Sequence, residues 1–195
     1  LKDFPERKLS PEIRFFRVVR RGRGPWWFGN SMQGRFDLPE PHGTCYVAAD
    51  ELAALLEVIA ADREGARVSS EFVAQRGIRE LQVPNEVVVS DLTSRRASGF
   101  GITAEIGTTL PYDRPQAWAA SLHEAGFLGI VYWLRHDPSR AEGIALFGLG
   151  GERKRWRRGR ELPISAELIE RLQAECGIEV VPIPSSKQLR ILDEE

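Results

Sequence analysis

The sequence predicts an α+β fold built as a single compact domain, in which mixed sheets are flanked by helices. Three observations lead to this class. Short alternating or wholly apolar runs predict strands, and longer segments with apolar residues every three or four positions predict helices. The two kinds of segment are mixed without the strict alternation of a parallel α/β sheet. The chain has 195 residues, a length that suits one domain.

The elements are expected in the following order. Strands are predicted at 13–19, 45–48, 87–92, 130–134, 144–147, 178–183 and 189–192. Helices are predicted at 51–62 after an Asp50 N-cap, at 70–81 after a Ser69 cap, from Asp113 to a stop at Gly126, and at 165–176. Residues 1–12 are interpreted as an N-terminal tail and 13–195 as the domain, whose last part, 149–195, holds a basic segment, a helix and closing strands.

Composition excludes several classes of function. Hydrophobic residues make up 42% of the chain and charged residues 28%, as in ordinary globular proteins, and the net charge of −1 does not call for a polyanionic partner. Two distant cysteines and three scattered histidines form neither a disulfide framework nor a metal site. No apolar run reaches membrane length, and the first ten residues are too charged for a secretory signal. We therefore expect a cytoplasmic protein without a metal cofactor.

One carboxylate stands out on the helix predicted at 51–62. Its apolar stripe is formed by Leu52, Leu55, Leu56 and Ile59. Glu57 lies off this stripe, and its helical neighbours are alanines, so a backbone or a ligand could approach it closely. The alternative is an ordinary surface glutamate.

Two arginines and a tyrosine precede this helix. Arg17 shares a strand face with Phe15 and Val19, and Arg35 lies between Gly34 and Phe36. A pair of fixed guanidinium groups suits a pyrophosphate, because each can donate two parallel charged hydrogen bonds. The ring of Tyr46 can stack on a flat heterocycle. With Glu57 as the carboxylate that orients a ribose or stabilises a sugar cation, these residues indicate a nucleotide-sugar site.

The same residues carry a resemblance to the RES domain family. The matching blocks are Phe16-Arg17, Gly34-Arg35-Phe36-Asp37, Gly43 to Ala48 and Ala53 to Glu57, followed more loosely by Asp91-Leu92-Thr93, Gln116 to Gly126, Gly129 to Tyr132 and Gly143 to Phe147. The resemblance covers residues 13–148, and the order and spacing of its first blocks are its most specific part.

Members of the RES family are typically toxins of toxin–antitoxin pairs, with a fold resembling ADP-ribosyltransferases, that destroy NAD, several by phosphorolysis. The resemblance therefore implies NAD as substrate, inorganic phosphate or water as co-substrate, and an antitoxin partner, with the chain in a homo-oligomer or in a hetero-oligomer with that antitoxin. It also implies roles for individual residues. Arg17 and Arg35 would hold the phosphates, Tyr46 would pack on the nicotinamide–ribose end, Glu57 would act at the glycosidic bond, and Arg135 would contact a phosphate.

The chain departs from the family pattern at Leu134, where the resemblance places the serine that gives the family part of its name. Leucine can neither donate nor accept a hydrogen bond. The serine's task would then fall to another hydroxyl, such as Ser139 or Thr93, or be absent.

Two other functions stay open. The same fold could transfer ADP-ribose to a protein. The chain could instead be a binding module, since the basic run 153–160 contains Trp156, a pattern that nucleic-acid-binding surfaces use. A solvated loop or a docking surface for an acidic antitoxin explains this run better than nucleic acid does. Similarly, Trp26, Trp27 and Phe28 form either a satellite cluster that pins the loop 20–44 or a wall of the nucleotide pocket.

Overall fold

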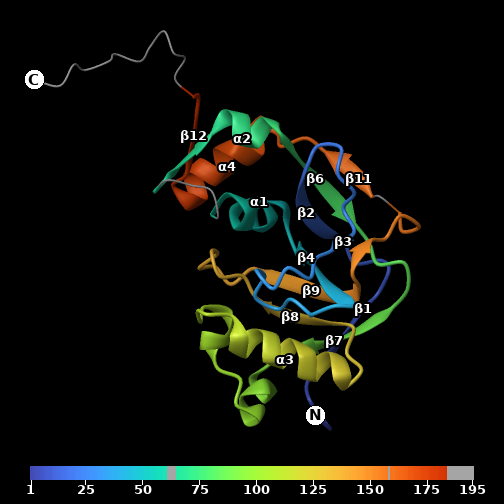
Figure 1. The fold of residues 1–195 in the computed structure, drawn as a ribbon. Coiled ribbons are helices and arrows are strands. Elements are labelled where there is room, and N and C mark those ends of the chain that lie inside the picture. The colour runs from blue at the N-terminus through green and yellow to red at the C-terminus, as the bar shows by residue number, and fades with distance from the viewer. Residues whose placement is uncertain (61–64, 158, 184–195) are drawn as a thin grey trace, which may run out of the picture.

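The fold is built on one eight-stranded sheet, seen edge-on in places in the computed structural model (Figure 1), which describes residues 1–60, 65–157 and 159–183. Its strand order is β1-β7-β8-β9-β4-β2-β6-β11. These strands span Glu6–Leu9 (β1), Phe15–Arg20 (β2), His42–Ala48 (β4), Arg76–Leu81 (β6), Val87–Asp91 (β7), Gly129–Trp133 (β8), Glu142–Leu149 (β9) and Arg160–Leu162 (β11). Among the described strands of this sheet, only β7 and β8 pair in parallel, so the sheet is mixed. The α+β class predicted from the sequence is confirmed.

Two smaller ribbons complete the strands. They are the antiparallel pair β3 (Trp27–Phe28) and β10 (Gly151–Glu152), and the parallel pair β5 (Arg67–Ser69) and β12 (Glu179–Val181). The helices are α1 (Glu51–Ala60), α2 (Ser70–Ala74), α3 (Asp113–Glu124) and α4 (Ala166–Cys176), with 3₁₀ turns at η1 (Arg95–Phe100) and η2 (Ala104–Gly107). Helices α1, α2 and α4 gather at one end of the sheet, and α3 lies beside β8 toward the other end (Figure 1).

The sheet consists of two halves that meet at a narrow seam. Strands β4 and β9 pair along their length, from His42↔Leu149 to Ala48↔Gly143, and β2 pairs with β6 along its length. Between the halves, β2 and β4 share the single register pair Phe16↔Ala48. Residues of both strands next to this pair line the cavity that is described below.

Alternation along the strands separates two hydrophobic clusters, one on each face of the sheet. Phe16, Tyr46 and Ala48 face the helices and the larger cluster, whereas Phe15, Cys45 and Val47 face the smaller one. The larger cluster also holds the predicted stripe of α1, since Leu52, Leu55, Leu56 and Ile59 are all buried there. Asp50 caps this helix as predicted, accepting a 2.8 Å hydrogen bond from the Ala53 amide.

Several predicted elements have different bounds in the structure. The helix expected at 70–81 is wrong: α2 ends at Ala74, and Arg76–Leu81 forms β6, because that segment pairs with β2 on one side and β11 on the other. Sheet pairing here overrides local helix propensity. Short strands β5, β10 and β11 were not predicted, and β3 lies within the expected loop 20–44. The end of the first predicted helix at 61–62 and the strand at 189–192 lie outside the described residues.

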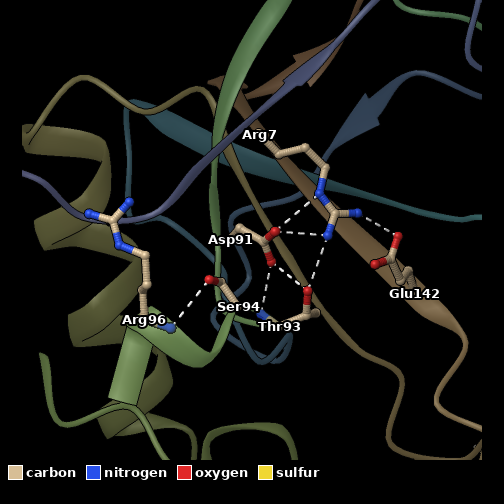
Figure 2. Close-up of polar contacts among 6 residues, drawn as sticks. All are labelled: Arg7, Asp91, Thr93, Ser94, Arg96 and Glu142. Atoms are coloured by element: carbon tan, nitrogen blue, oxygen red, sulfur yellow. Dashed lines mark hydrogen bonds and ion pairs between the residues drawn. The ribbon is translucent and has the colours of Figure 1, made fainter. Parts of the chain in front are cut away.

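The segment expected to be a tail instead contributes an edge strand. Residues Glu6–Leu9 form β1, which pairs antiparallel with β7. Figure 2 shows the ionic network that fastens it. Arg7 donates to Asp91 Oδ2 from Nε (3.1 Å) and Nη2 (2.8 Å), and Nη1 donates to Glu142 Oε2 (2.6 Å). Burial alone would lower the pKa of Arg7, but the hydrogen bonds to Glu142 and Asp91 outweigh it and raise that pKa.

Helices in the described part of the chain are too short or too polar to cross a lipid bilayer.

Candidate functional site

A half-open cavity of roughly 330 Å³ lies at the seam between β2 and β4. Helix α1 lies along one side, and the loop before β4 and the segment after β8 supply other walls. The lining residues include Phe16, Arg17, Gln33, Gly34, Arg35, Tyr46, Ala54, Glu57, Tyr112, Tyr132, Leu134, Arg135 and His136. The five site residues predicted from the sequence, Arg17, Arg35, Tyr46, Glu57 and Arg135, therefore line the same cavity, although they come from separate elements.

Glu57 enters the cavity from the polar side of α1. Its Oε1 accepts a 2.9 Å hydrogen bond from the backbone amide of His136. This bond fixes the carboxylate and also ties the segment after β8 to α1. The charge of Glu57 acts on both Arg35 and Tyr132, which places all three side chains in one electrostatic group.

Arg35 is a buried cation, with 8% of its surface exposed. Its Nη1 donates to the backbone carbonyls of Ile106 (3.3 Å) and Thr109 (3.1 Å), and its guanidinium lies 4.8 Å from the ring centre of Tyr112. Within the described residues, Arg35 has no ion pair with a carboxylate. Burial lowers the pKa of Arg35, and the nearby positive charge of Arg135 lowers it further. A desolvated cation of this kind attracts an anion.

The turn that carries Arg35 is held by Tyr46 and Asp37. The hydroxyl of Tyr46 accepts from the amide of Phe36 (2.8 Å) and donates to Asp37 Oδ1 (2.9 Å), while Asp37 Oδ2 accepts from the amide of Gly34 (2.9 Å). Burial and the charge of Asp37 raise the pKa of Tyr46 well above 10.0. The hydroxyl of Tyr46 therefore positions the turn, and its ring lines the cavity.

Two further side chains satisfy the backbone of the same loop. Thr44 Oγ1 donates to the carbonyl of Phe36 (2.8 Å) and accepts from the amide of Leu38 (3.2 Å). Nε2 of Gln116, on α3, donates to the carbonyls of Met32 and Gly34, each at 2.9 Å. The cavity wall at Arg35 is thus tied to both β4 and α3.

Arg17 lines the cavity at the seam, but one nitrogen of its guanidinium bonds to groups outside the cavity. Its Nη1 donates to the carbonyls of Pro25 (2.5 Å) and Trp27 (3.2 Å) and approaches Cys45 Sγ at 2.7 Å. These partners lie on the sheet face with Phe15, as the strand pattern predicted. In the described part of the chain, the other guanidinium nitrogens of Arg17 make no hydrogen bond.

Leu134 forms an apolar wall beside Arg135. Its side chain is 5% exposed and lies against Gly143, where an added Cβ would come within 2.5 Å of Leu134 Cδ2. Neither hydroxyl considered as a substitute reaches the cavity. Ser139 is bonded to Asp137, and Thr93 is bonded to Asp91 and Arg7 in the network of Figure 2. Neither Ser139 nor Thr93 is among the residues that line the cavity, so the structure gives no support to either as a replacement for the family serine.

The aromatic loop and the basic run pack together away from the cavity. Trp26 and Phe28 are buried in the smaller cluster, where the ring of Trp156 lies 4.9 Å and 5.8 Å from theirs. Trp26 Nε1 also donates to the carbonyl of Arg157 at 2.7 Å. The satellite-cluster interpretation is thus confirmed for Trp26 and Phe28, whereas Trp27 is 54% exposed and lies outside that cluster. Trp156 anchors the basic run to the domain.

Sequence reasoning missed several cavity residues. Tyr132 is buried, and burial together with the charge of Glu57 raises its pKa. Strand alternation from Ile130 would have placed Tyr132 on the helix-facing side. Nothing local marks Tyr112, which reaches Arg35 only through the tertiary fold.

Within the described residues, no group of three or more His, Cys, Asp or Glu side chains is arranged to hold a metal ion.

The mixed sheet and its cation-lined cavity define an α+β domain with a candidate site for an anionic ligand. A family model described as the RES domain matches residues 14–166, and the chain therefore belongs to the RES domain family. The match extends beyond the 13–148 region seen in the sequence and includes the basic run.

A solved structure has a similar fold. A chain in the crystal structure of the M. tuberculosis MbcT–MbcA toxin–antitoxin complex superposes with a TM-score of 0.57, at 17% identity over 82% of each chain. No curated protein sequence matches the chain.

Proposed function

We propose that this chain binds NAD in the cavity at the β2–β4 seam and cleaves its nicotinamide–ribose bond. The observation that carries this proposal is the juxtaposition of Glu57, held by the His136 amide, with the buried Arg35, which has no carboxylate partner among the described residues. Arg135 and Arg17 line the same cavity. One carboxylate beside several cations suits a substrate that has a positively charged ring nitrogen at its glycosidic bond and negatively charged phosphates.

The geometry suggests how the bond breaks. Departure of nicotinamide leaves positive charge on the ribose, and a fixed carboxylate at Glu57 would stabilise that charge. The guanidinium groups would hold the phosphates and keep the reacting carbon in place. Phosphate attack would give nicotinamide and ADP-ribose 1-phosphate; water attack would give nicotinamide, ADP-ribose and a proton.

The family and the structural neighbour support a proposal for the biological setting. We infer that the chain is a toxin of a toxin–antitoxin pair, acts in the cytoplasm and is neutralised by a protein antitoxin. Membership of the RES family and the likeness to a chain of a toxin–antitoxin complex support this inference.

Product analysis after incubating the pure protein with NAD, with and without phosphate, tests the activity. Glu57→Gln should lower nicotinamide release on the order of 100-fold or more, because the charge that stabilises the transition state is lost. Glu51→Gln is the matched control, since it changes a glutamate on the same helix that does not line the cavity. No release by the unaltered protein under either condition would end the proposal.

Arg35 is tested with Arg35→Lys, which keeps the charge but loses the fork, and with Arg35→Ala. Both should weaken NAD binding, Ala the more, while circular dichroism checks that each variant folds. Arg95→Ala, at an exposed position outside the cavity, is the control.

Label from radioactive NAD on a macromolecule would favour ADP-ribosyl transfer, and binding without turnover would favour a binding module.

A further inference from the structure

A row of paired residues crosses the sheet at the cavity. Strand pairing places Tyr132 of β8 beside Gly143 of β9, and Gly143 beside Ala48 of β4. The next pair in the row is Phe16↔Ala48, at the seam between β2 and β4. Tyr132, Ala48 and Phe16 all line the cavity. The row therefore leads from Tyr132, across a residue without a side chain, to the seam where the cavity lies.

The ring of Tyr132 lies over Gly143. A Cβ added at Gly143 would be 2.7 Å from Tyr132 Cζ and 2.9 Å from its hydroxyl oxygen, so the phenol end occupies the space that a side chain at position 143 would fill. The ring also meets Phe36 edge-on, with the ring centres 4.9 Å apart. Gly143 and Phe36 thus fix the ring, and the hydroxyl points from β8 toward β9 and the seam.

The hydroxyl of Tyr132 has no hydrogen-bond partner within the described part of the chain. It is not fully enclosed either, because the described side-chain atoms that are both enclosed and unpartnered belong to Arg79 and His123. By contrast, the hydroxyl of Tyr46 bonds within the protein. The hydroxyl of Tyr132 is therefore available to a ligand in the cavity.

The charges around Tyr132 decide what its hydroxyl can do. Burial and the negative charge of Glu57 raise the pKa of Tyr132, against the opposite effect of Arg35. The hydroxyl therefore keeps its proton in neutral solution and acts as a hydrogen-bond donor rather than as a base. Although the charge of Glu57 acts on Tyr132, no hydrogen bond joins the two side chains in the described structure.

A ligand oxygen that contacts both Glu57 and Tyr132 has to be a hydroxyl. The carboxylate of Glu57 only accepts hydrogen bonds, so the ligand oxygen must donate to it and must also accept from Tyr132. A phosphate oxygen without a proton cannot donate, and the carboxylate repels it. In NAD, the hydroxyl next to the nicotinamide–ribose bond is the 2′-hydroxyl of that ribose.

We propose that Tyr132 is a further catalytic residue, whose hydroxyl donates a hydrogen bond to the 2′ oxygen of the ribose that carries nicotinamide. This inference rests on the proposed function and deepens it. A 2′-hydroxyl that accepts from Tyr132 turns its single proton toward Glu57, and the two hydrogen bonds strengthen one another. The carboxylate is thereby held beside the reacting carbon, where positive charge develops as nicotinamide leaves.

Tyr132 also brings a hydroxyl to the wall formed by Leu134. Cδ2 of Leu134 would lie 2.5 Å from the same added Cβ at Gly143 that lies 2.9 Å from the Tyr132 oxygen, so the two side-chain ends are neighbours. Both side chains belong to the larger cluster, as expected for positions two residues apart along an extended chain. Tyr132 thus supplies the hydroxyl that the chain lacks at position 134.

A double-mutant cycle between protein and substrate tests the contact. Tyr132→Phe should lower kcat/KM for NAD about tenfold, as expected for the loss of one hydrogen bond. With an NAD analogue that lacks the 2′-hydroxyl on the nicotinamide ribose, the same change should alter kcat/KM less than about twofold. Each comparison uses one substrate, so the different reactivity of the analogue cancels. The urea midpoint should stay unchanged, because the hydroxyl has no partner among the described residues.

Tyr46→Phe is the matched control, because that hydroxyl bonds to the turn before β4 rather than facing a ligand. It should lower kcat/KM for NAD and for the analogue by similar factors. A rescue experiment adds Leu134→Ser to Tyr132→Phe. Nicotinamide release from NAD per folded molecule should rise at least about threefold over Tyr132→Phe alone, because a new hydroxyl enters the same wall.

The outcomes separate the two proposals. A loss in Tyr132→Phe that is equal for NAD and the analogue, or no loss with NAD, would overturn the inference and leave the proposed function standing. No gain from the added Leu134→Ser would overturn the claim that Tyr132 supplies the hydroxyl missing at position 134. No nicotinamide release from NAD by the unaltered protein would overturn the proposed function and the inference with it.

Discussion

The hydroxyl of Tyr46 and the carboxylate of Asp37 are joined by a 2.9 Å hydrogen bond at the base of the turn that presents Arg35. The same hydroxyl accepts from the amide of Phe36, so one side chain of β4 fixes two points of this turn. A role expected to involve only the ring of Tyr46 therefore includes the placement of a cation. The bond links the strand to the proposed ligand site.

Tyr46→Phe should separate these two roles. The ring stays, but the amide of Phe36 and Oδ1 of Asp37 lose their partner, which should lower the free energy of unfolding by about 1–2 kcal/mol. KM for NAD should rise more than kcat falls, because Arg35 is less well placed. Urea titration and steady-state kinetics measure the two effects, and an unchanged KM would show that the turn holds Arg35 without the hydroxyl.

Gly34→Ala should disturb the same turn by steric contact. A Cβ at Gly34 would lie 2.3 Å from Asp37 Oδ1 and 2.7 Å from the Tyr46 hydroxyl, so those groups must move. We expect a loss of about 1–3 kcal/mol in unfolding free energy and weaker NAD binding. Gly99→Ala is the control, since nothing lies within 4 Å of its added Cβ. Equal stability of the two variants would argue against the close packing around Gly34.

Stability should fall in alkaline solution. Burial raises the pKa of Tyr46 above 10.0, so the folded chain keeps a proton that the unfolded chain loses as the pH passes about 10. The unfolding free energy is then fully retained below about pH 10 and declines above it. Urea titrations at about pH 8 and about pH 11 measure this decline, which should be smaller in Tyr46→Phe. An identical decline in both proteins would assign it to other groups, such as Tyr132.

Arg7→Met should loosen the edge strand. The variant leaves Asp91 and Glu142 without their partner in the network of Figure 2, and we expect a loss of about 1–3 kcal/mol in unfolding free energy. Lys8→Met changes the neighbouring, more exposed cation, whose ion pair within the described residues is with Glu86, and should cost less than about 0.5 kcal/mol. Hydrogen exchange at β1 should rise in the first variant alone.

Leu134→Ser tests the departure from the family serine. The side chain packs in the larger cluster, so the change should lower the unfolding free energy by about 2–4 kcal/mol. Because Glu57 and Arg35 stay in place, nicotinamide release per folded molecule should change by less than about tenfold. A much larger increase would show that the chain lacks a hydroxyl its chemistry needs.

The sequence was most informative where local pattern and burial agree. The stripe of α1 and the Asp50 cap followed from spacing alone, and the alternation in β2 placed Arg17 on the face with Phe15. The five predicted site residues line one cavity. They could be predicted because local patterns identified the strands and the helix that carry them, and the resemblance indicated which residues belong to one site.

The rest depended on contacts between distant residues. Residues 76–81 have a helix-compatible sequence, and only pairing with β2 and β11 makes them a strand. Arg7 forms a structured edge through Asp91 and Glu142, which are 84 and 135 residues away. Similarly, Tyr112 stacks on Arg35 from the start of α3, and no local spacing encodes that meeting.

The single register pair between Phe16 and Ala48 gives the domain a mechanical weak line. Backbone hydrogen bonds that resist separation are dense within each half of the sheet and sparse between the halves. A molecule bound at this line would touch Arg17 on one half and Tyr46 on the other, and would so connect the two halves of the sheet. Occupancy of the site should thereby stiffen the whole sheet rather than the cavity alone.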